Sequence, residues 1–146
     1  WKNGISEYPR GEAPLQKRVQ WLLKELGQDP REVCASNLIF AQSRQASDIS
    51  YDIAKTCWPV HEDILRIVKP KLIIAFGNSK VSPYRYLHTM FWGQEEVQES
   101  GHGTWKLKGF QTQINSESLY VAGLPHLSRY SPIGKHHVIE WLLEKL

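Results

Sequence analysis

PVHEDILRIVKPKLIIAFG, residues 59–77, holds the pattern that decides the fold class. Pro59 suits the first turn of a helix, apolar residues recur at helical spacing as far as Val68, and Pro70 stops the helix. The run 71–77 is almost continuously apolar and closes on glycine, which is typical of a central parallel strand covered on both faces. A helix that leads directly into such a strand predicts an α/β fold.

The elements on either side of this stretch extend the alternation. We expect helices over 14–26, 81–91 and 138–146, strands over 33–40 and 119–124, and a small hairpin over 104–114 around Lys108-Gly109. Alternating strands and helices imply right-handed crossovers. The expected fold is therefore three-layer α/β/α, with a central, mainly parallel four-stranded sheet. Ligands of such sheets bind outside the carboxyl ends of the strands.

The composition is that of one folded domain. The chain has 146 residues, of which 41% are hydrophobic and 23% charged, which argues against disorder. Its net charge of +3 suits a nucleic-acid partner without demanding one. The 6 Trp and 6 Tyr residues could fill the core or stack on bases.

Cysteine usage and hydropathy exclude several other classes of protein. The two cysteines, Cys34 and Cys57, form no CxxC pair, so neither a zinc ribbon nor a disulfide framework is indicated. The apolar runs are shorter than a membrane span requires, and no secretory signal is visible. We expect no metal, no cofactor and no membrane partner, and a cytoplasmic (nucleoid-associated) or nuclear location.

Two polar segments follow predicted strands. The first contains Asn37 and the second is PHLSRYS, residues 125–131. The amide of Asn37 offers one acceptor and two donors, which match the N3–H and O4 of uracil or thymine. His126 could stabilise charge that develops on a base oxygen. Each signal has a plainer explanation, because asparagine often caps turns and Pro-His is common in loops.

In this order, the two segments and the central stretch resemble the uracil-DNA glycosylase superfamily over residues 14–146. VCASN (33–37) is similar to that family's uracil-reading strand, residues 57–77 to its helix and following strand, and residues 125–131 to its His-Pro-Ser minor-groove loop. The resemblance implies a glycosylase that flips uracil or a related base out of DNA and hydrolyses its N-glycosidic bond.

The resemblance also implies roles for individual residues. Asn37 would bind the flipped base, and His126 would be catalytic, donating a hydrogen bond to O2 as the base departs as an anion. Ser128 would pinch a phosphate, and Tyr130 would be the wedge that fills the gap in the duplex. Further DNA contacts would come from Arg44, Arg129 and Ser131. An alternative for Tyr130 is packing under the final helix, against Ile133 and Trp141.

Other charged and histidine residues carry weaker predictions. Lys80, Arg85 and Lys135 fall near predicted loop ends, where they could meet phosphate or simply solvent. We expect a solvated or capping role for His61. The Gly101-His102-Gly103 segment is predicted to be a flexible loop with no identifiable partner.

The chain departs from the family at two places. Leu127 stands where the motif has proline, and the Gly- and Pro-rich motif that positions water is not visible. Gly11-Glu12-Ala13-Pro14 resembles that motif superficially but runs straight into a helix. We therefore expect the first strand and this motif to precede Trp1. The alternatives are a catalytically inactive module of the same fold that binds nucleic acid or a protein, and an unrelated nucleotide-binding protein, which no Gly-rich loop supports.

Overall fold

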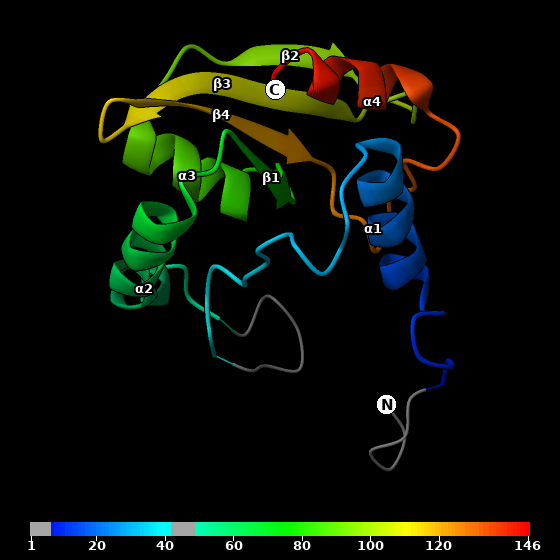
Figure 1. Ribbon diagram of the computed structural model, residues 1–146, viewed down its shortest axis with the longest axis horizontal. Helices are drawn as coiled ribbons and strands as arrows, with labels where there is room; N and C mark the ends of the chain where they lie inside the picture. Colours follow the sequence, from blue (N-terminus) through cyan, green and yellow to red (C-terminus); the bar gives the residue numbers. More distant parts are fainter. Residues whose placement is uncertain (1–6, 42–48) are drawn as a thin grey trace.

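A computed structural model describes residues 7–41 and 49–146. It is a mixed α/β structure with one four-stranded sheet (Figure 1). In chain order the elements are α1 (Pro14–Glu25), α2 (Ile53–Val68), β1 (Leu72–Phe76), α3 (Pro83–Phe91), β2 (Glu96–Glu99), β3 (Lys106–Ile114), β4 (Glu117–Leu124) and α4 (His136–Leu143). No helix in these two ranges is long and apolar enough to cross a membrane.

The stretch that decided the fold class forms the expected helix and strand. The apolar run after Pro70 forms β1, as predicted. Helix α2 begins at Ile53 rather than at Pro59, which lies exposed inside the helix. A proline there removes one backbone hydrogen bond but does not end this helix.

The sheet is open, and the expectation that it is mainly parallel is wrong. Its strand order is β1-β4-β3-β2, and only β1 and β4 are parallel. Strands β3 and β4 are joined by the two-residue turn Asn115-Ser116, in which both residues have positive φ. A hairpin turn of this kind can connect only antiparallel strands.

Three strand predictions fail for identifiable reasons. Residues 33–40 form no strand, because no neighbouring strand within the described ranges bonds to them. Residues 106–114 form one continuous strand instead of a hairpin, and Gly109 leaves room for a cross-strand side chain: a Cβ there would lie 2.0 Å from the Tyr120 hydroxyl. Strand β2, EVQE, was missed because all its residues are exposed and give little apolar signal.

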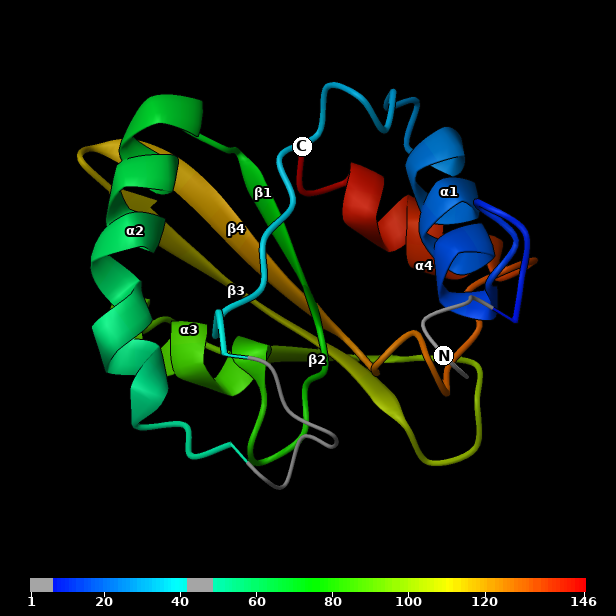
Figure 2. The ribbon, with the colours of Figure 1, turned by 90° about the horizontal axis from the view of Figure 1, so that it is seen from below.

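The helices pack on both faces of the sheet, α1 and α4 on one face and α2 and α3 on the other (Figure 2). Alternate residues of β4 serve the two faces. Tyr120, Ala122 and Leu124 join the cluster with α1 and α4, while Leu119 and Val121 join the cluster with α2 and α3.

The extended segment 30–41 connects α1 to α2 and runs between them in both views (Figures 1 and 2). His61 holds it in place: its Nε2 lies 3.0 Å from the Leu38 carbonyl oxygen, and its ring stacks on Phe40 at 5.1 Å. His61 therefore anchors this segment to α2, instead of having the solvated or capping role expected from the sequence.

Candidate functional site

The sheet topology brings three loops to one edge. β1 and β4 are parallel and end together, so the loops 77–82 and 125–135 leave the same edge. β3 is antiparallel to β4, and β2 to β3, so the loop 100–105 that joins them also lies there. Figure 2 shows this third loop beside the segment that follows β4. We call this edge, where the loops 77–82, 100–105 and 125–135 meet, the loop edge. It is the edge at which ligands of parallel strands bind.

These three loops carry only positive charge. Residues 77–82, 100–105 and 125–135 contain no aspartate or glutamate, but they include Lys80, Arg129 and Lys135. Of the five cations expected to meet phosphate, Arg85 lies in α3, and Arg44 lies outside the described residues. The loop edge is therefore suited to an anionic ligand.

His126 is exposed on this edge, and Ser128 contacts one of its two ring nitrogens. Its Nδ1 lies 2.8 Å from the Ser128 hydroxyl oxygen and 3.2 Å from the Ser128 backbone nitrogen. A ring nitrogen that accepts a backbone N–H bond carries no proton, so the neutral tautomer has its proton on Nε2. Burial, and secondarily the positive charge of Arg129, lowers the pKa of His126, which favours this neutral form.

Ser128 therefore orients His126. The sequence predicted that Ser128 contacts phosphate, and its hydroxyl is instead bonded to the histidine ring. The other ring nitrogen of His126, Nε2, has no hydrogen-bond partner among the described residues. It can donate one bond to a ligand on the loop edge.

Gly77 lies beside His126, in a backbone conformation that favours glycine. It has φ +113°, and a Cβ built there would lie 3.8 Å from Cδ2 of His126, the ring carbon next to Nε2. Asn78 ties this loop to the sheet, because its Nδ2 donates to the carbonyl oxygens of Lys106 (2.8 Å) and Gly123 (2.7 Å). Sequence reasoning missed Asn78, although an amide directly after a buried strand was the available signal.

Tyr130 is a core residue, not the exposed side chain that a wedge requires. It is 0% exposed, and it belongs to the same buried cluster as Trp141. Its hydroxyl donates to the Ser100 carbonyl oxygen at 2.7 Å. The prediction that Tyr130 is a wedge is therefore wrong. The packing alternative is confirmed as far as the shared cluster with Trp141, whereas Ile133 is 48% exposed and lies outside that cluster.

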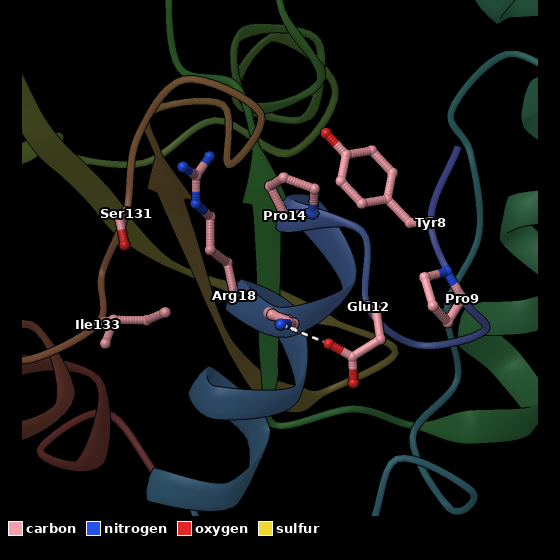
Figure 3. Close-up of a pocket in the computed structure, with 8 residues that line it drawn as sticks. Tyr8, Pro9, Glu12, Pro14, Arg18, Ser131 and Ile133 are labelled. Carbon is pink, nitrogen blue, oxygen red and sulfur yellow. Dashed lines mark ion pairs between the residues drawn. The ribbon is translucent and has the colours of Figure 1, made fainter. Parts of the chain in front are cut away.

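A groove of about 580 Å³ lies beside the loop that carries His126. Figure 3 shows Arg18, Ser131 and Ile133 on one side of it and Tyr8 on the other. The Arg18 guanidinium donates to the Leu127 carbonyl oxygen at 2.5 Å, which links α1 to the His126 loop. This contact was not predictable from the sequence, because a cation between apolar helix residues usually points to solvent.

No hydrogen bond joins Asn37 to His126 among the described residues. Asn37 is exposed in the extended segment, and its carbonyl oxygen accepts a bond from Ser36 Oγ at 3.4 Å. Neither Asn37 nor His126 lines this groove, and a pocket shared by the two residues stays a prediction. Arg44, the remaining predicted DNA contact, lies outside those residues.

Within the ranges that the structure describes, no group of histidine, cysteine and acidic residues could hold a metal ion. Comparison with known proteins gives no further guidance. No family model, curated protein or solved structure matches this chain.

Proposed function

We propose that this chain is a three-layer uracil-DNA-glycosylase-like domain that hydrolyses the N-glycosidic bond of uracil or a related base in DNA. The observation that carries the proposal is the state of His126, a neutral histidine with Nε2 free at an edge whose loops are only cationic. The sequence resemblance supports the same reading.

In this mechanism the bond between the sugar C1′ and the base breaks and its electron pair leaves with the base. His126 Nε2–H donates to O2, where the negative charge accumulates. A water molecule adds to C1′ and loses a proton, and one proton taken up from solvent neutralises the base anion. A neutral donor is suited to this task because it stabilises the anion without transferring its proton. Lys80, Arg129 and Lys135 bind the DNA phosphates, and Asn37 remains the predicted base contact.

A second candidate is a nucleic-acid-binding module of this fold that excises no base. The observation that favours it is that Asn37 is exposed and does not line the groove. Base excision requires a pocket that encloses the flipped base. The two candidates share the cationic edge and differ only in catalysis.

Uracil release from a labelled oligonucleotide by the full-length protein separates the two candidates. For a glycosylase, His126→Ala should lower release by about 10²–10³-fold, the typical effect of removing one donor to a developing oxyanion. His136→Ala, which removes an exposed histidine of α4, should leave release unchanged. Tight binding of the oligonucleotide with no release would favour the binding module instead.

A further inference from the structure

The loop Ser100–Trp105 is fastened rigidly to the His126 loop. The buried Tyr130 hydroxyl donates to the Ser100 carbonyl oxygen at 2.7 Å. On the other side, a Cβ on Gly101 would lie 2.9 Å from the His137 ring and 3.5 Å from Lys135 Cδ, so the loop also lies close to the end of the His126 loop and the start of α4. A surface shared by both loops therefore keeps a fixed shape.

The loop is also stiff within itself. The Ser100 hydroxyl donates to the Trp105 carbonyl oxygen at 2.6 Å and accepts from the His102 backbone N–H at 3.2 Å. The Trp105 N–H bonds to the His102 carbonyl oxygen at 3.1 Å. Because of these bonds the loop is an ordered turn, and the prediction of a flexible loop is wrong. The turn carries two aromatic rings.

The two rings presented to solvent are those of His102 and Trp105. Both residues are exposed, Trp105 by 38%, and their ring centroids are 4.8 Å apart. Lys135 lies nearby, with its Nζ 5.6 Å from the centroid of the Tyr130 ring beneath. The acidic residue closest in sequence, Glu99, is neutralised by an ion pair with Lys106.

We propose that the 100–105 loop is a second nucleic-acid contact, in which Trp105 stacks on an unpaired base of the strand bound at the His126 loop. This inference rests on the proposed function and adds to it a preference for unpaired nucleotides. An exposed aromatic side chain on an ordered loop beside a cation suits single strands, because every base has a face that can stack and every nucleotide carries a phosphate. Lys135 is placed to meet that phosphate.

The test is the affinity of the protein for a short fluorescent oligo-dT, measured by anisotropy for Trp105→Ala, Trp105→Phe and Trp92→Ala. Stacking on Trp105 predicts about a 5- to 150-fold weaker affinity for Trp105→Ala, and near-normal affinity for Trp105→Phe, which retains an aromatic face. Trp92 is the matched control, because it is 77% exposed and lies at the opposite end of β2. Its removal should change nothing.

Intrinsic fluorescence gives a second readout that does not depend on the alanine variant folding. Oligo-dT should quench the wild-type emission, and Trp105→Phe should lose that quenching while it still binds. Equal affinities for Trp105→Ala and Trp92→Ala would overturn the inference, as would a poly-glutamate peptide whose binding depends equally on Trp105. Oligo-dT contains no uracil, so it measures binding apart from catalysis. A protein that binds oligo-dT through Trp105 but releases no uracil from a uracil-containing oligonucleotide would refute only the enzymatic proposal.

Discussion

At the scale of single residues, the bonds around His126 determine which proton it carries. Protonation of Nδ1 would break the bond that this nitrogen accepts from the Ser128 backbone N–H. It would also place a second positive charge near Arg129. Both effects oppose the imidazolium form, so the free Nε2–H belongs to a neutral ring over most of the physiological pH range.

We predict that His126 titrates below the ordinary histidine value of 6.5, and that Arg129→Ala raises its pKa, because a nearby positive charge is removed. Imidazole ¹⁵N chemical shifts measured against pH report both the pKa and the Nε2–H tautomer. Because the folded-state pKa is lowered, folding stability should begin to fall as the solution is acidified below pH 6.5, whereas base release should fall only around the lower folded-state pKa. A His126 pKa at or above 6.5 that does not change in the Arg129→Ala variant would contradict this account.

The location of the polar segment could be predicted from the sequence, but the directions of its side chains could not. The polar segment 125–131 was recognised because it interrupts an apolar run at a strand end. The directions of its side chains were not predictable, since Tyr130 turns inward to reach Ser100, a partner 30 residues away in the sequence. Ser128 turns toward His126 because its hydroxyl bonds to the ring of a residue only two positions away. Residue composition does not predict such a local bond.

At the scale of elements, helix α3 lies against β4 through a contact that requires glycine. A Cβ on Gly123 would lie 2.4 Å from the Tyr84 ring, and Tyr84 is itself 1% exposed with its hydroxyl 3.1 Å from Glu95. Neither the ring nor the backbone can move freely, so the missing side chain at position 123 is what lets the helix approach the sheet.

We predict that Gly123→Ala lowers the free energy of unfolding by about 1–3 kcal/mol, the usual cost of overpacking a core. Urea denaturation of Gly123→Ala, Tyr84→Leu and the double variant measures the coupling between the two positions. Removing the ring should relieve the clash, so the alanine should cost much less in the Tyr84→Leu background. Costs that simply add would show that the two side chains do not compete for this space.

The elements that the sequence predicted well are those whose burial is periodic. Helices α1 and α4 have apolar residues at helical spacing, and β1 is a continuous apolar run. The bounds of α1 and β1 agree with the prediction to within one residue, whereas α4 spans His136–Leu143 instead of 138–146. The antiparallel part of the sheet left weaker signals. β2 is polar throughout, and the Asn115-Ser116 turn lacks the glycine that usually marks a hairpin. Residues 33–40 have a strand-like pattern, but a strand also needs a partner, which pattern alone does not supply.

At the scale of the whole molecule, charge is distributed unevenly about the sheet. The chain has 15 acidic residues, yet none falls in the three loops at the edge where β1 and β4 end. Glu95 and Glu96, which lie where α3 leads into β2, are used internally. Glu95 pairs with Lys108, and Glu96 is bonded by Tyr120, Trp141 and Lys145. The net charge of +3 therefore understates how positive the loop edge is.

We predict that DNA binding weakens with salt, and that Arg129→Ala and Lys135→Ala each reduce the slope of log K against log salt by about one. Each phosphate contact releases condensed counterions, so losing a contact flattens the salt dependence by a fixed amount, whatever the DNA sequence. Lys71→Ala is the matched control, because Lys71 is an exposed cation that precedes β1, at the opposite edge of the sheet. Anisotropy titrations at several salt concentrations would measure the slopes. Equal slopes for all three variants would mean that DNA does not bind at the loop edge. That result would contradict both the glycosylase and the binding-module proposals, because both require DNA at this edge.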